Sequence, residues 1–153
     1  MKLKKTMFLF FVFFIFSCVC SFGQKIKVLS DKMEVFENQG LIVFTGHVKA
    51  VKGDLKVWAN KLYVYYKIEN GKRNVKKMVA LGNVVIKKDG WRSYSGKATY
   101  FKPEERLILE EEPKVWHGKD LVEGDVVVVY FKEGRSEVLA RGEGRVKVNV
   151  YTE

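Results

Sequence analysis

Few side chains in this chain are of a type and spacing that could carry out catalysis. His47 and His117 are candidates for a general base, but they stand about seventy residues apart, and no Gly-x-Ser-x-Gly nucleophile motif accompanies them. Each is better explained as a strand residue with a local hydrogen bond. Gly142-Glu143-Gly144 lacks the third glycine and the strand–helix context of a phosphate-binding turn. The sequence therefore predicts a protein that is not an enzyme and has no cofactor.

Two runs of charged residues are candidates for binding ions. Glu110-Glu111-Glu112-Pro113 is the densest acidic run, but a calcium site needs carboxylates that converge from several turn positions. A strand running into a solvated rim explains the run, so no metal site is predicted. The basic residues are expected near one end of the fold, where lysines either oppose edge-to-edge aggregation or contact phosphates and acidic sugars. This basic cluster contains Lys72, Arg73, Lys76, Lys77, Lys87, Lys88 and Arg92, and its candidate phosphate contacts are Lys76, Lys77, Lys87 and Arg92.

The first 23 residues have the pattern of a secretory signal peptide. Lysines near the start precede the apolar run 7–16, and Ser21-Phe22-Gly23 supplies small residues before a cut ahead of Gln24. Two alternatives stay open: lipidation of Cys18, and an uncleaved N-terminal anchor. The predicted domains are therefore a signal peptide over 1–23 and one folded domain over 24–153.

Export bounds the chemistry and the partners of the remaining domain. Removing residues 1–23 takes away three lysines and no acids, which lowers the formal net charge from +10 to +7. Both cysteines, Cys18 and Cys20, leave with the signal, so no disulfide is expected even in an oxidising compartment. A basic exported domain is suited to anionic lipid or phosphorylated glycan, and export makes nucleic acid an unsuitable partner.

The elements that must position these residues are all strands. Apolar residues alternate with period two, β-branched and aromatic residues are dense, and tight turn sequences such as Asn70-Gly71 and Asp89-Gly90 separate the alternating segments. Tight hairpins pair successive strands antiparallel. The predicted strands are 26–29, 32–37, 41–52, 55–66, 73–87, 91–101, 106–117, 120–131 and 136–151.

A pattern that recurs four times, starting at residues 30, 59, 95 and 123, shows how the long strands bend. The apolar residues change parity at Gly82, Gly96 and Gly124, and one-residue changes of parity mark corners where a strand re-aims its side chains. Strands that turn corners at corresponding positions form a folded-over sheet, a jelly roll or twisted roll. The pairs expected on one face are Met33/Val35, Leu62/Val64, Ala98/Tyr100 and Val126/Val128.

Two sets of residues follow from this architecture as candidates for function. The first is the apolar inner face, which is core in any case and is also the candidate lining of a lipid groove; it comprises Val35, Leu62, Val64, Val84, Ile86, Leu107, Leu109, Val126 and Val128. The second is a pair of uncovered strand edges at the two ends of the chain, which invite pairing between molecules. These edges contain Ile26, Val28, Val146, Val148 and Val150.

Three of the corner segments also carry a family resemblance. Phe44-Thr45-Gly46-His47-Val48, Ala80-Leu81-Gly82-Asn83-Val84 and the weaker Arg141-Gly142-Glu143-Gly144-Arg145 resemble the repeated Gly-Asn-Val segments of OstA-like domains. The segments 52–62 and 122–130 resemble two further motifs of that family, in the family's order. The chain is thus similar over residues 25–150 to the LptA family of periplasmic lipopolysaccharide-transport proteins. His47 stands where the family usually has Asn.

The resemblance implies a twisted antiparallel β-jelly roll whose interior holds the acyl chains of lipid A. It further implies head-to-tail subunits that carry lipopolysaccharide from the inner to the outer membrane, with components of the transport machinery at both membranes as partners. Two alternatives remain: a membrane-tethered relative of the same system, and an envelope carbohydrate-binding or structural jelly roll. In the second alternative Trp58, Trp91 and Trp116 would form a sugar platform.

Overall fold

The computed structural model describes residues 25–152. The predicted signal peptide, its cut before Gln24 and the candidate lipidation at Cys18 lie outside these residues. Within them, no helix is long and apolar enough to cross a membrane.

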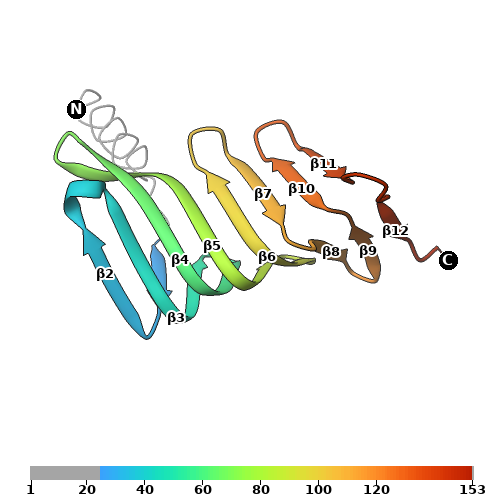
Figure 1. Cartoon of the computed structure of the whole chain (residues 1–153), viewed down its shortest axis with the longest axis horizontal. Coiled ribbons are helices and arrows are strands. Elements are labelled where there is room, and N and C mark those ends of the chain that lie inside the picture. Colours follow the sequence, from blue (N-terminus) through green and yellow to red (C-terminus); the bar gives the residue numbers. More distant parts are fainter. Residues whose placement is uncertain (1–24, 153) are drawn as a thin grey trace, which may run out of the picture.

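The described chain is almost entirely antiparallel sheet, as the alternation predicted (Figure 1). Its one helical element is the short 3-10 turn η1 (Glu37–Gln39). Its strands are β1 (Ile26–Leu29), β2 (Lys32–Phe36), β3 (Leu41–Lys52), β4 (Leu55–Glu69), β5 (Lys72–Lys88), β6 (Trp91–Phe101), β7 (Arg106–Glu110), β8 (Lys114–His117), β9 (Asp120–Glu123), β10 (Val126–Tyr130), β11 (Arg135–Leu139) and β12 (Lys147–Asn149).

A row of corners divides the sheet into two half-sheets. Strands β3 to β6 run through both halves, and their pairing slips at Thr45/Val48, Trp58/Lys61 and Leu81/Val84. The chain is interrupted instead between β1 and β2, at residues 30–31, and in the later strands, at residues 111–113, 124–125 and 140–146. Half-sheet I has the order β2-β3-β4-β5-β6-β7-β10-β11, and half-sheet II has the order β1-β3-β4-β5-β6-β8-β9-β12.

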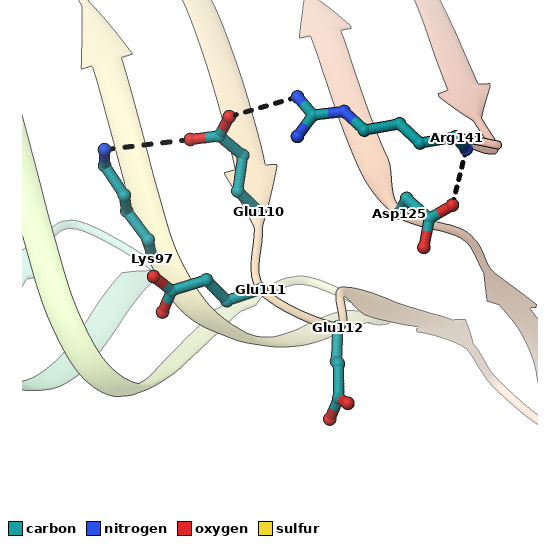
Figure 2. Close-up of a pocket in the computed structure, with 6 residues that line it drawn as sticks. All are labelled: Lys97, Glu110, Glu111, Glu112, Asp125 and Arg141. Atoms are coloured by element: carbon teal, nitrogen blue, oxygen red, sulfur yellow. Dashed lines mark hydrogen bonds and ion pairs between the residues drawn. The ribbon is translucent and has the colours of Figure 1, made fainter.

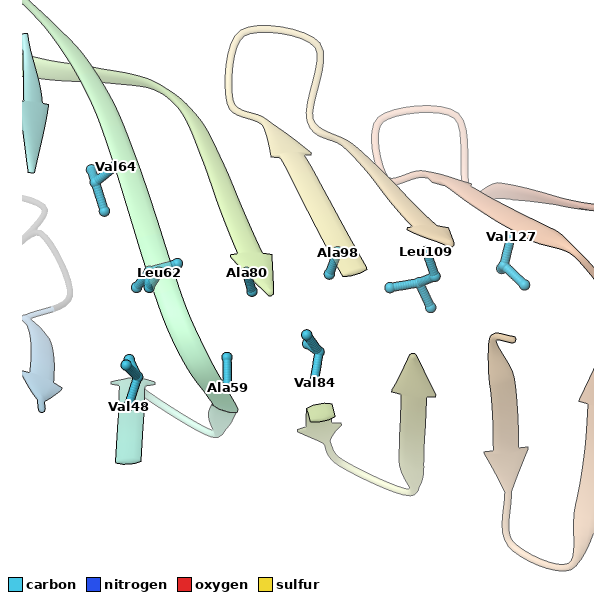
Figure 3. Packing of buried hydrophobic residues seen from close by; sticks show 9 residues of the cluster. All are labelled: Val48, Ala59, Leu62, Val64, Ala80, Val84, Ala98, Leu109 and Val127. Atoms are coloured by element: carbon cyan, nitrogen blue, oxygen red, sulfur yellow. The ribbon is translucent and has the colours of Figure 1, made fainter. Parts of the chain in front are cut away.

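The core lies between the two half-sheets. Val48, Ala59 and Val84 of half-sheet II are in the same buried cluster as residues of half-sheet I, and the two sets of side chains lie around one space in Figure 3. The members from half-sheet I are Leu62, Val64, Ala80, Ala98, Leu109 and Val127. The folded-over architecture expected from the parity changes is confirmed, since each half-sheet buries the face that it turns toward the other.

Val126 and Val128 are buried, as expected of core residues, but the register places them on the opposite face from the one predicted. Val127 pairs with Leu109, which pairs with Ala98, so Val127 and not Val126 continues the inner row. In the fourth occurrence of the recurring pattern, the corner residue is Asp125. Its backbone amide donates to the carbonyl of Leu139, as the backbone amide of Asp31 donates to the carbonyl of Gly46. The pattern starts at 30 and 123 place Gly124, instead of Asp125, at the position equivalent to Asp31. Every later residue is then shifted by one, and a one-residue shift moves a strand's side chains to the opposite face.

Candidate functional site

On the inner face of each half-sheet, a band of mostly apolar side chains runs from one sheet edge to the other. In half-sheet I the register places side by side Met33, Phe44, Leu62, Ala80, Ala98, Leu109, Val127 and Val138. In half-sheet II it places side by side Val28, Ala50, Val57, Ile86, Ser93, Val115, Val122 and Val148. These two bands face each other between the half-sheets, and together they are called the trough.

Burial along the trough falls from its middle toward its ends. Val84 and Leu109 are 0% and 2% exposed, whereas Met33 and Val148 at the two edges are both 55% exposed. Of the residues predicted to line a groove, Leu62, Val64, Val84 and Leu109 lie in the buried cluster, and Ile86 and Leu107 pack against it. Val35 lies on the same face near the β2 edge and is exposed.

Polar groups on the inner face are concentrated on β6. Ser93 and Ser95 are both buried there, and the Ser95 hydroxyl has no hydrogen-bond partner among residues 25–152. Ser95 lies opposite the fully buried Val84 in the sheet. The inner face of the described residues therefore presents mainly apolar surface and few polar groups.

A charged hollow lies outside the trough at the corner of β7, β10 and β11 (Figure 2). Glu110 forms ion pairs with Lys97 at 3.8 Å and with Arg141 at 3.6 Å, and the Arg141 backbone amide donates to the Asp125 carboxylate at 2.5 Å. Glu111 and Glu112 take left-handed backbone angles where the chain passes from β7 to β8. These contacts join neighbouring strands at the corner, and residues 25–152 contain no group of three or more candidate metal ligands.

The two histidines lie apart in the structure, at different corners and turns. His47 Nδ1 lies 2.7 Å from the Asp31 carboxylate, and this hydrogen bond together with the negative charge raises the pKa of His47 above its ordinary value. The His117 ring stacks on Trp91 with 4.3 Å between centroids. Neither histidine has a nucleophile beside it among the contacts described for residues 25–152.

The expectation that the basic cluster gathers at one end is wrong. Strand β5 passes through a corner at Gly82–Asn83, so Lys76 and Lys77 lie in half-sheet I while Lys87 and its neighbour Arg92 lie in half-sheet II. Lys76 forms an ion pair with Glu69 at 2.8 Å. The sequence clustering is real, but a 17-residue strand carries its two ends into different halves.

The three tryptophans do not form one platform. The Trp58 ring lies under Lys49 and Lys87, at 5.6 and 5.3 Å, and the Trp116 ring lies under Arg92 at 4.6 Å. Trp91 has the parity of Ser93 and Ser95 and so lies on the inner side, at the rim.

Both ends of the sheet expose apolar side chains. Strands β1 and β2 pair only with β3, β11 pairs only with β10, and β12 only with β9, so each carries a free edge within the described residues. The exposed large apolar residues at the β1/β2 end are Ile26, Leu29, Met33, Val35 and Phe36, and those at or after β11 and β12 are Leu139, Val146, Val148, Val150 and Tyr151. Four of these exposed residues, Ile26, Val146, Val148 and Val150, were predicted from the sequence as edge residues. The sequence analysis did not predict that β2 and β11 also form free edges.

Comparison with known proteins gives three findings. A family model described as LptA/(LptD N-terminal domain) LPS transport protein matches residues 27–135. An uncharacterized protein of Rhizobium meliloti (strain 1021) is 26% identical over 134 residues, which is 83% of this chain and 71% of that protein. The fold is similar to that of LptH, the LptA homologous periplasmic component of the lipopolysaccharide transport device of Pseudomonas aeruginosa. That similarity has a TM-score of 0.72 and 18% identity over 84% of this chain and 96% of the LptH chain.

Proposed function

Because the chain belongs to the family of LptA/(LptD N-terminal domain) LPS transport proteins, we propose that it binds lipopolysaccharide in the periplasm. It carries this lipid from the inner toward the outer membrane, with its acyl chains held in the trough. The observation that supports this function is the apolar inner face, which continues to both edges of the sheet. Residues 24–153 form the transporting domain, and residues 1–23 direct export and are then removed.

Acyl chains are the part of the cargo that the trough would bind. Each apolar group removed from water stabilises the complex by roughly 25 cal/mol per Å². Toward the edges, Met33, Val35 and Val148 are exposed on the inner face and have apolar surface left to bury. The sugars and phosphates of the lipid stay outside, because only Ser93 and Ser95 interrupt the apolar bands near the middle of the trough.

Subunits would stack end to end through the free edges. A strand edge with unpaired backbone groups readily accepts a strand from another molecule. The β1/β2 end and the β11/β12 end are unlike, so joining them is a heterologous contact that propagates instead of closing a dimer. Stacking joins the trough of one copy to that of the next, and the terminal copies would meet inner- and outer-membrane components of the transport machinery.

Neighbouring residues on opposite faces of β10 allow a sharp test. A photocrosslinking residue at Val127 should capture lipopolysaccharide in cells, whereas one at Val126, on the outer face, should not. Leu62 and Lys61 form a second pair of this kind on β4. Equal capture from the two positions of each pair, in proteins that fold, would contradict the trough.

The alternative functions predict different results. A carbohydrate-binding jelly roll would co-purify with glycan and without acyl chains, which mass spectrometry of the purified protein distinguishes. A membrane-tethered relative would bind the same lipid but remain with the membrane fraction after export.

A further inference from the structure

Most of the net positive charge of the described residues lies in one half of the fold. Half-sheet II and its turns comprise 25–29, 48–59, 84–95, 114–123 and 147–152, which hold eleven lysines and arginines and four carboxylates. The remaining described residues, half-sheet I with its corners and turns, hold fourteen cations and thirteen carboxylates. The net charges are therefore +7 and +1, so half-sheet II differs in charge from half-sheet I although the two share one fold.

The cations of half-sheet II gather on its outer face, which points away from the trough. Register and alternation place on this face seven cations, Lys27, Lys49, Lys56, Lys87, Arg92, Lys114 and Lys147. Its one carboxylate, Glu123, pairs with Lys114 at 3.5 Å. Half-sheet I instead pairs its cations with carboxylates, as in Lys32–Glu34 at 2.8 Å.

Three of these cations stand directly beside one another. Lys56 lies opposite Lys87 across β4 and β5, and Lys87 lies opposite Arg92 across β5 and β6. Like charges directly opposite each other in a sheet are destabilising. None of the three has a carboxylate partner among residues 25–152. A fold that keeps such a row where uncharged residues would be more stable indicates an anionic binding partner.

Aromatic residues on the same face narrow the class of partner. Trp58 and Trp116 lie on this face among the cations, and Tyr94 lies between β5 and β8 in the same row as Trp58. Tryptophan and tyrosine are amphipathic and are enriched where protein meets the headgroup region of a bilayer. Lysine stems can lie along apolar surface while their ammonium groups reach lipid phosphates. The first strand of the described residues, β1, is also an edge strand of half-sheet II.

We propose that the outer face of half-sheet II docks on a bilayer surface rich in anionic phospholipid, at the Lys56–Lys87–Arg92 row. Docking would leave half-sheet I toward solvent and hold the trough alongside the membrane. Attraction between an anionic surface and a nearby lysine or arginine amounts to about a fivefold change in partitioning per charge, and it weakens with salt.

The test compares two charge-matched variants of the full chain on vesicles. Lys56→Gln combined with Lys87→Gln should lower co-sedimentation with vesicles of equal parts phosphatidylcholine and phosphatidylglycerol by about 25-fold. Lys61→Gln combined with Lys102→Gln removes the same charge from half-sheet I, where both side chains are exposed, and should change binding by less than about twofold. Vesicles of phosphatidylcholine alone give the baseline.

Two further measurements separate docking from a structural role. Removing Lys56 and Lys87 relieves repulsion, so the thermal midpoint should stay unchanged or rise. Tryptophan emission should shift to the blue on binding, because Trp58 and Trp116 lie on the docking face. Equal loss of binding in both variant pairs would overturn the proposal, as would release of bound protein by inorganic phosphate at modest concentration. No preference for phosphatidylglycerol would overturn it as well, leaving an acidic protein as the occupant.

Discussion

Left-handed backbone at the corners restricts which residues the chain accepts there. Gly46 and Gly82 have φ of +84° and +80°, and His47 and Asn83 follow with +46° and +47°. Two successive left-handed residues turn the strand and re-aim its side chains. A side chain of the neighbouring segment occupies the space beside each glycine, Asp31 of the β1–β2 link at Gly46 and Asn60 of β4 at Gly82. Glycine is thus needed at Gly46 and Gly82 for two reasons, the backbone angle and the close approach.

Substituting Gly82 with alanine should separate these two reasons. The new methyl group would collide with Asn60, and we expect Gly82→Ala to cost about 2–4 kcal/mol of unfolding free energy. Gly71 in the β4–β5 turn has a similar φ of +73° but nothing within 4 Å, so Gly71→Ala should cost only about 1 kcal/mol. Urea denaturation of both variants measures the difference. Equal costs would mean that backbone strain alone requires glycine at the corner.

The His47–Asp31 pair gives one corner a pH dependence. Because Asp31 raises the pKa of His47 in the folded protein, the protonated ring stabilises the fold below its ordinary pKa of 6.5. That stabilisation disappears as the pH rises through the raised folded value. Asp31→Asn should bring the pKa of His47 down toward 6.5 in an NMR titration and remove this part of the pH dependence. A pKa that is unchanged in the variant would show that Asp31 is not the cause.

At the scale of the strands, alternation and turn residues predicted most of the fold. The ends of β1, β3 and β6 agree with the predicted ranges, because Gly, Asp and Asn at the turns mark where alternation stops. Three predicted strands, 106–117, 120–131 and 136–151, are each interrupted in the structure. For 106–117 even the corner was missed, because a corner built on Glu111 and Glu112 lacks the glycine that marked the others. Non-glycine residues in left-handed conformation leave little signal in a single sequence.

The face of a strand was harder to predict than its existence. In β10 five consecutive apolar residues, Val126 to Tyr130, carry no alternation of their own. Their face depends on which preceding residue occupies the corner, and Gly124 and Asp125 are both good turn formers. Only the pairing of Val127 with Leu109 and Val138 settles the choice.

For the whole molecule, net charge could be read from the sequence but its partition could not. Lys77 and Lys87 stand ten residues apart on one strand, yet they belong to half-sheets of different charge. The partition depends on where each strand passes its corner, which is a property of the fold. The same reason explains why a basic cluster in the sequence became two groups in space.

Assembly through the free edges can be tested with an edge lysine and a matched control. Val148→Lys places a charge on exposed β12, and lysine on an edge opposes strand addition, so concentration-dependent oligomers should be lost. Ile68→Lys introduces the same change at a residue that is also exposed but lies on the β4–β5 hairpin, away from both edges. Sedimentation velocity over a range of concentrations compares the two. Undiminished oligomers in Val148→Lys, or equal loss in both variants, would contradict assembly through this edge.

The difference between continuous and interrupted strands gives the molecule unequal stiffness along its length. Strands β3 to β6 run unbroken through the corner and are paired on both sides of it, so the angle between half-sheets is fixed there. Toward the C-terminal end only the short links 111–113 and 124–125, and then the longer link 140–146, join the halves. Such links bend at lower cost than paired strands. The strands β3 to β6 of each subunit are thus a rigid frame and its C-terminal end is a compliant hinge, so a row of subunits would flex at regular intervals and tolerate a varying span.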